Sequence, residues 1–405
     1  MMHPNPTRWA VVKRLSWVSL LAMLALAVAG VFAIYSATYR GEDVANAPFW
    51  KMQAMWIGIG LAGFTAAVAI DYRQIGKWTW VLYSVCVLLL IVVLVAGAER
   101  YGSRSWLGIK GLGIQPSEFA KIGLAFALAY YLSDPEREAR SFKTLMVCLA
   151  MLGGTVGLIL LEPDLGSAAV LLPMAATMMF VAGIPLRYYF GGLLLAAILG
   201  AVFYTNLVGY QKESEALRHA APDKATYTQQ LIELKRKYIL KPYQWERILV
   251  FLNPERDPYG WGWNLRQSQI AVGSGGVTGK GWLQGTQNVL GFLPRQVAPN
   301  DFIFSVIAEE GGFAACGLVL IGYAVLLLNG LWTALAARDR LGRLLATGIT
   351  VVLFCHVFVN IGMTIGLVPI TGLPLPLLSY GGSFVLSTMV ALGILQNIRA
   401  RRTTY

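Results

Sequence analysis

Charged residues are scarce in this chain of 405 residues. Asp, Glu, Lys and Arg make up 13% of it, whereas soluble domains carry about 25%. The apolar residues gather in runs of about 20, the length of helix that crosses a hydrocarbon core about 30 Å thick. A soluble fold would need many helices that are apolar on all sides, with too little polar surface to cover them. The composition therefore excludes an ordinary soluble domain and predicts an integral membrane protein.

Residues that build disulfide frameworks and metal sites are also few. The four cysteines lie in apolar runs without a C-x-x-C pair, and the three histidines are far apart in the sequence. Cysteines in such a setting are typical of small buried side chains, so neither a disulfide framework nor a zinc site is expected. A net charge of +12 would suggest nucleic acid in a soluble protein. In a membrane protein, basic residues in short loops set the topology instead.

Ten apolar segments are long enough to span a membrane, and they must be helical because lipid offers the backbone no hydrogen-bond partner. The sequence thus predicts an all-α fold, a polytopic membrane protein with about ten transmembrane helices in one domain over residues 1–405. A large extracytoplasmic loop, residues 206–300, follows the seventh span. The expected spans are Leu15–Tyr35, Phe49–Ile70, Trp78–Ala96, Ser117–Leu132, Leu145–Leu161, Leu165–Val181, Leu186–Thr205, Phe302–Leu328, Leu344–Leu367 and Phe384–Ile398.

Lys and Arg are unequally divided between the two sets of short loops. If the N-terminus is inside, the cytoplasmic loops and termini hold 15 of them and the short outer loops hold 5. Basic residues are retained on the cytoplasmic side. We therefore expect both termini in the cytoplasm.

The long loop has two parts of different character. Residues 211–240 are charged and favour a helix, which we interpret as an insertion forming an amphipathic helix on the outer leaflet. Residues 243–293 are rich in Gly, Trp and Gln, and Gly clusters permit close approach of a ligand. A long loop with many aromatic residues usually has a function. The second part is predicted to bind or act on a substrate, and a plain flexible loop is the alternative.

Two pairs of ionisable residues stand where lipid makes them costly, which makes them functional candidates. Glu118 and Lys121, three residues apart at the start of the fourth span, can pair on one helix face. Such a pair either positions the helix or lines a substrate cavity. Glu162 and Asp164 stand at the outer boundary between the fifth and sixth spans, where Asp164 is either a functional carboxylate or a helix cap.

Two further places are polar. Asp301 precedes the eighth span, where the long loop re-enters the membrane, and it is a candidate catalytic group or a helix N-cap. Residues 372–383 contain Pro374, Pro376 and a Gly pair, which exclude regular helix. Non-helical backbone at membrane depth is tolerated only inside protein or along a cavity. This segment, with Ser379, is therefore predicted to line a polar cavity.

Five stretches in this order resemble the SEDS family (shape, elongation, division and sporulation), the RodA and FtsW peptidoglycan polymerases. The resemblance runs through nearly all ten spans. Residues 279–287 and 358–363 resemble the RodA (elongation) branch, and FtsW is the near relative. The five stretches are Gln115–Lys121, Pro163–Gly166, Gln267–Gly276, Asp301–Glu310 and Asn360–Ser383.

The resemblance implies a glycosyltransferase of the bacterial inner membrane that polymerises lipid II into glycan strands for cell-wall elongation and rod shape. Asp301 matches an essential Asp that precedes Phe-Ile-Phe in the family, and it would act as the general base or as a ligand of a divalent cation, Mg or Mn. The implied partners are lipid II, a class B penicillin-binding protein transpeptidase and other elongation-complex proteins.

The departing pyrophosphate needs positive charge. The candidates, all extracytoplasmic in the predicted topology, are Arg104, Lys110, Arg247, Arg266 and Lys280. Other residues predicted to bind substrate are Glu118, Lys121, Asp164 and Ser379.

The chain departs from the family pattern at several places, among them the following three. The loop before Asp301 is about two residues longer than usual and lacks a Glu and a His, so its local structure is expected to differ. Glu162 replaces a usual Gln, and Trp245 stands where an Arg is usual.

Two other classes of function stay open on the residues alone. A lipid II flippase would also suit ten spans, a buried ion pair and a broken helix, but it needs polar groups through the membrane depth. A polymerase needs them at the outer face, where Asp301 and Asp164 are expected. A non-catalytic scaffold would not need Asp301.

Overall fold

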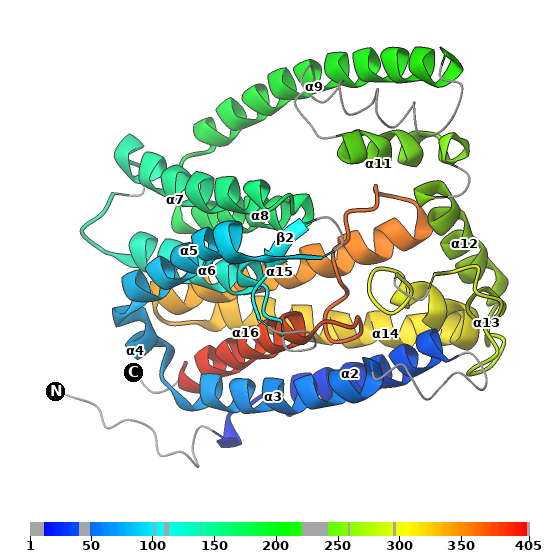
Figure 1. Cartoon of the computed structure of the whole chain (residues 1–405). Coiled ribbons are helices and arrows are strands. Elements are labelled where there is room, and N and C mark those ends of the chain that lie inside the picture. The colour runs from blue at the N-terminus through cyan, green and yellow to red at the C-terminus, as the bar shows by residue number, and fades with distance from the viewer. Residues whose placement is uncertain are drawn as a thin grey trace.

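The computed structural model describes residues 12–39, 49–100, 103–108, 113–138, 140–220, 242–257, 260–294 and 297–402. This part of the chain is almost entirely helical (Figure 1), apart from one antiparallel hairpin, β1 (Ala98–Arg100) with β2 (Ser103–Trp106). Nine of its helices are long and apolar enough to cross a membrane. A further helix, α6 (Pro116–Ser133), lies among them and is buried along most of its length. The predicted all-α polytopic fold is confirmed.

Each expected span corresponds to one long helix. Besides α6, these are α2 (Trp17–Thr38), α3 (Phe49–Ala69), α5 (Thr79–Ala96), α7 (Phe142–Leu161), α8 (Leu165–Ala182), α9 (Leu186–Ala220), α14 (Ile303–Ala336), α15 (Arg340–Ile365) and α16 (Gly382–Arg401). Shorter elements are α4 (Tyr72–Lys77), α11 (Pro242–Leu252), the 3₁₀ turn η2 (Pro254–Arg256), α12 (Trp261–Ser274) and α13 (Thr286–Val289). The elements of the long loop, α11, α12 and α13, gather at one end of the bundle (Figure 1).

The start of the long loop differs from the expectation. Helix α9 does not stop near Thr205 but continues to Ala220, so residues 211–220 belong to the seventh span's own helix and not to a separate surface helix. Charged residues beyond the apolar run are good helix formers, and nothing in hydropathy requires a helix to end at the membrane surface. The rest of the proposed insertion lies outside the described residues.

Helices α16 and α9 mark the centre and the edge of the bundle. Helix α16 packs against α3, α15 and α6 and is buried on nearly all sides. Helix α9 exposes most of its apolar side chains and stands apart from the other long helices in Figure 1.

Trp245 of α11 is fully buried and packs on Phe203 and Tyr210 of α9, with ring centroids 4.9 and 5.8 Å away. The unusual Trp at this position therefore holds α11 against α9.

Helix α14 is broken at Gly312, where φ is 63°, and the Gly-rich loop enters the break. Two helix carbonyls and two helix N–H groups lose their helical partners there, and loop backbone replaces all four. Gly clusters do permit a close approach here: a Cβ at Gly279 would lie 2.1 Å from the Glu310 carbonyl oxygen. The four bonds are Lys280 N to Glu309 O (3.0 Å), Gly281 N to Glu310 O (3.0 Å), Phe313 N to Gly276 O (2.9 Å) and Ala314 N to Val277 O (3.0 Å).

Candidate functional site

Asp301 lies two residues before the first residue of α14, at the end of the bundle that meets the long loop, and it is half-buried. The N-cap of α14 is Phe302, and no side chain caps this helix. The alternative that Asp301 serves as a helix cap is therefore wrong. The carboxylate faces Gly372, since a Cβ built there would lie 3.7 Å from Oδ2 of Asp301.

The non-helical segment before α16 forms the wall beside Asp301. The side chain of Asn360 donates to the carbonyl oxygens of Asp301 (3.0 Å) and Leu373 (2.7 Å), and so joins the two. The hydroxyl of Ser379 donates to the carbonyl oxygen of Asn300 and accepts the N–H of Leu375. Ser379 thus lies beside Asp301, and its hydroxyl connects the two loop segments.

The carboxyl of Asp301 titrates above its ordinary range. Burial raises its pKa from 3.8 to about 6, and the nearby positive charge of Arg247 opposes the rise. The effect of desolvation on the pKa of Asp301 is therefore larger than that of the Arg247 charge. At neutral pH the group is still mostly ionised, yet it holds a proton more readily than an exposed Asp, as a general base requires. Arg247 comes from α11, so the long loop contributes a charge to this site.

The other predicted cations have different surroundings. Arg266 pairs with Glu255 at 3.1 Å on an exposed surface. The ammonium of Lys280 lies 2.6 Å from Glu309 at the break in α14, so it holds the Gly-rich loop. Arg104 belongs to β2 but its side chain, like the whole of Lys110, lies outside the described residues. Arg247 is thus the candidate that the described structure brings to Asp301.

Glu162 and Asp164 occupy the corner between α7 and α8. Asp164 caps α8, because its Oδ1 accepts the N–H of Ser167 at 2.9 Å, and its Oδ2 accepts from Gln115 at 3.1 Å. The helix-cap alternative for Asp164 is therefore confirmed. The first turn of α8 touches the wall segment, since a Cβ at Gly166 would lie 2.9 Å from the side chain of Leu373.

Glu162 is fully buried, and neither carboxylate oxygen has a hydrogen-bond partner among the described residues. Burial, with a smaller contribution from the charge of Asp164, raises the pKa of Glu162 from 4.5 to about 8. The side chain is therefore protonated at neutral pH. A buried acid without partners is costly, and this residue replaces the Gln expected from the family pattern.

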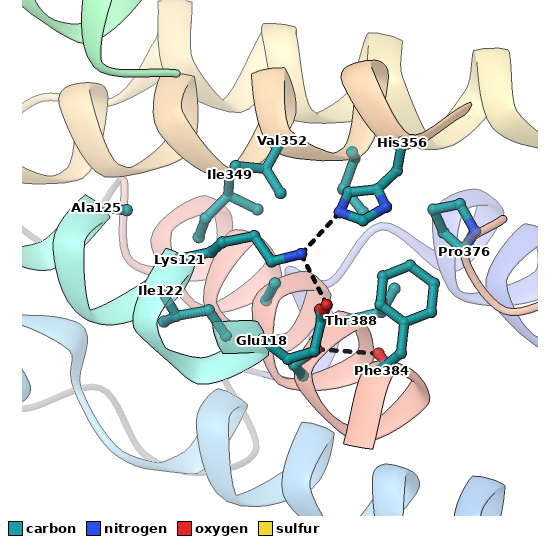
Figure 2. Close-up of a pocket in the computed structure, with 13 residues that line it drawn as sticks. Glu118, Lys121, Ile122, Ala125, Ile349, Val352, His356, Pro376, Phe384 and Thr388 are labelled. Carbon is teal, nitrogen blue, oxygen red and sulfur yellow. Dashed lines mark hydrogen bonds and ion pairs between the residues drawn. The ribbon is translucent and has the colours of Figure 1, made fainter. Parts of the chain in front are cut away.

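A second polar cluster lies inside the bundle (Figure 2). The ammonium of Lys121 is 2.8 Å from Oε1 of Glu118 and 3.0 Å from Nε2 of His356. An ammonium only donates, so Nε2 accepts, and Nδ1 carries the proton that it donates to the Pro374 carbonyl oxygen at 3.2 Å. The predicted Glu118–Lys121 pair is thus confirmed as a contact. The cavity beside it measures about 30 Å³, which is room for one or two water molecules and not for a sugar.

This cluster is connected to the wall beside Asp301. The Pro-rich segment has no helix to satisfy its carbonyl groups, and side chains from α14 and α15 do so instead. Asn360 binds Leu373, His356 binds Pro374, and the hydroxyl of Tyr323 binds the Pro376 carbonyl at 2.6 Å.

Two of the side chains that hold the wall, His356 and Asn360, are not among the predicted site residues. They stand four residues apart and so share one face of α15. Two polar residues at that spacing in an apolar run are the sequence signal that could have found them.

Comparisons with known proteins show the family of the chain. The family model described as "Cell cycle protein" (FtsW, RodA and SpoVE) matches residues 16–404. The chain is 35% identical to peptidoglycan glycosyltransferase RodA of Treponema pallidum, over 95% of this chain and 97% of that protein. It is 34% identical to peptidoglycan glycosyltransferase MrdB of Escherichia coli K12, over 95% and 93%. It is 35% identical to the probable peptidoglycan glycosyltransferase FtsW of Geobacter metallireducens, over 96% of each.

Solved structures are similar over the same length. One, described as "Structural coordination of polymerization and crosslinking by a peptidoglycan synthase complex", has a TM-score of 0.74 at 29% identity and covers 96% of this chain and 98% of its own. The Rod shape determining protein RodA of Thermus thermophilus has a TM-score of 0.65 at 27% identity, with the same coverage. The chain therefore belongs to the FtsW/RodA/SpoVE family of polytopic membrane proteins, the SEDS family.

Proposed function

We propose that this chain is a peptidoglycan glycosyltransferase that polymerises lipid II into glycan strands. The observation that carries the proposal is the half-buried carboxylate of Asp301, with its pKa raised to about 6, under the influence of the Arg247 guanidinium. A base and a cation at one site are what glycosyl transfer from a pyrophosphate donor needs. The names of the relatives support the same activity.

The chemistry divides between these two side chains. The 4-hydroxyl of the acceptor GlcNAc attacks the anomeric carbon of the donor, and Asp301 takes the hydroxyl proton as the new C–O bond forms. The bond from the anomeric carbon to the undecaprenyl pyrophosphate breaks, and the leaving group carries away the electron pair. Arg247 stabilises the charge that develops on that pyrophosphate.

A divalent cation, Mg or Mn, is proposed as an assistant to the leaving group. Among the described residues, no group of three or more His, Cys, Asp or Glu side chains is placed to hold a metal ion. Magnesium at phosphate sites commonly takes only one or two protein carboxylates, with phosphate and water supplying the rest. In this role, which is the alternative to that of general base, Asp301 would be the single protein ligand of the cation. The cation would neutralise charge on the pyrophosphate.

The proposal also covers the orientation of the chain in the membrane, its protein partner and its branch of the family. The unequal distribution of Lys and Arg supports an orientation in the bacterial inner membrane with both termini in the cytoplasm, which puts Asp301 on the outer face. A class B penicillin-binding protein is the proposed partner, because a structural relative is described as coordinating polymerization and crosslinking in one complex. Overall identity does not separate the two branches, because the RodA and FtsW relatives are both 35% identical to this chain. The RodA branch is therefore proposed from the local resemblance of residues 279–287 and 358–363.

A detergent experiment separates the polymerase from the flippase. In detergent there is no bilayer to cross, so a flippase has no measurable product, whereas a polymerase still joins lipid II into strands. We expect the purified chain, mixed with lipid II and its transpeptidase partner, to give long glycan strands on a gel. Absence of strands, with lipid II transport in vesicles intact, would contradict the proposal.

A further inference from the structure

A groove of about 550 Å³ opens at the opposite end of the bundle from Asp301, where α2 begins and where α14 and α16 end. It is an open groove on the surface of the bundle and not an enclosed pocket. Its apolar rim is strongly exposed and so faces lipid, with side chains 51–70% accessible. The rim consists of Val18, Leu328, Leu331, Trp332 and Leu335.

One cation in this groove, Arg399, has a side-chain atom that no other described residue satisfies. Arg399, in the last turn of α16, has a buried Nε atom without a hydrogen-bond partner, and no ion pair to it is found among the described residues. The neighbouring polar groups are already engaged: Asn329 donates to the Ser16 hydroxyl at 2.9 Å, and Gln396 accepts the Ser16 N–H at 2.9 Å. A partly buried guanidinium without a counter-ion is costly, and a phosphate satisfies it well.

The lining of the groove, where the structure describes it, carries one positive charge, that of Arg399. No Asp or Glu lines it within the part of the chain that the structure describes. Arg402 follows Arg399 by three residues, and Lys13 and Arg14 precede Ser16 by three and two residues. Trp332 is a residue type enriched at the membrane–water interface. The groove thus combines an apolar face with a cationic end at the depth where phospholipid headgroups lie.

We propose that this groove binds one anionic phospholipid of the cytoplasmic leaflet, with its phosphate on Arg399 and an acyl chain on the exposed face of α14. A partner's transmembrane helix fits less well, because it would have to bring an acidic residue to membrane depth to meet Arg399. Anionic and zwitterionic phospholipids both carry a phosphate there, but the choline cation of phosphatidylcholine cancels the net negative charge that Arg399 would attract. The proposal does not depend on the glycosyltransferase activity.

Native mass spectrometry of the full-length, detergent-purified chain with added phosphatidylglycerol or phosphatidylcholine tests this. We expect a bound phosphatidylglycerol in the wild type, with affinity at least about tenfold higher than for phosphatidylcholine, and a loss of about tenfold in Arg399→Gln. The matched control is Arg187→Gln, an exposed Arg of α9 on the same side, which should change the affinity by less than about twofold.

A second variant guards against misfolding of the first. Leu335 is 70% exposed, so Leu335→Asp leaves the core intact while adding an acid to the groove, and it should abolish phosphatidylglycerol binding. Equal loss in Arg399→Gln and Arg187→Gln would overturn the site, as would equal binding of the two lipids. Protection of a Cys placed at Leu331 by the transpeptidase partner, without protection by phosphatidylglycerol, would assign the groove to a protein helix instead.

Discussion

Replacing Glu162 by Gln should make the protein more stable, and increasingly so as pH rises. Glu162 is fully buried with both oxygens lacking a described partner, and its pKa is raised from 4.5 to about 8. In the unfolded chain this carboxyl ionises near 4.5, whereas in the folded protein it stays protonated to about pH 8. Its contribution to stability is thus fully present below pH 4.5 and is lost as pH rises toward 8.

The size of the effect follows from the two pKa values. A tenfold difference in proton affinity between the folded and unfolded chain corresponds to about 1.4 kcal/mol, so at pH 7 the group costs roughly 3 kcal/mol relative to acidic solution. An amide of the same shape does not titrate in this range. The stability difference between Glu162→Gln and the wild type should therefore grow by about 2–3 kcal/mol between pH 5 and pH 7.

Thermal melting in detergent at pH 5, 6, 7 and 8 measures this. We expect the melting temperature of the wild type to fall relative to that of Glu162→Gln across the series, with glycan synthesis retained in the variant. The control is Glu136→Gln, in an exposed turn, whose curve should run parallel to the wild type. If the melting temperatures of wild type and Glu162→Gln also run parallel, the carboxyl is not buried as described.

The other predictions concern the site. The rate of glycan synthesis should rise with pH through about 6 as Asp301 ionises. Arg247→Gln should lower the rate and move this rise to higher pH, because the charge that lowers the pKa of Asp301 is gone. A rise at the same pH in the variant would contradict the influence of Arg247 on Asp301. Gly372→Ala should lower activity about tenfold in the same assay, because φ is +77°, which strains any residue with a Cβ and so shifts the backbone beside Asp301. Wild-type activity in this variant would show that the backbone at Gly372 does not position Asp301. Glu118→Ala should lower the melting temperature in detergent, because the buried Lys121 ammonium loses its only carboxylate among the described residues. An unchanged melting temperature with lost activity would point to contact with substrate.

Much of the fold could be predicted because lipid allows few alternatives. An apolar run of about 20 residues in a bilayer has to be a helix, and all ten expected spans are helices. The end of α9 could not be placed in this way, because beyond the membrane surface nothing in hydropathy ends a helix. The break in α14 is equally hidden from the sequence: it depends on loop backbone that arrives from residues 276–281.

The site was partly predictable for a related reason. Asp301 and the Pro-rich segment stand out because each is costly at its depth, and the structure brings them together. Which cation joins them is a matter of tertiary packing: Arg247 arrives on α11, while Lys280 is held by Glu309. The Gly clusters predict a ligand loop, yet in the described structure their close approach is to a helix.

The most direct test of the whole account is the polymerisation of lipid II by Asp301→Asn, purified with its transpeptidase partner and compared with the wild type. The amide keeps the size of the side chain but cannot take a proton at neutral pH. We expect the variant to fold, to melt within a few degrees of the wild type and to make no glycan strands. Strands of normal length and amount from Asp301→Asn would contradict the account.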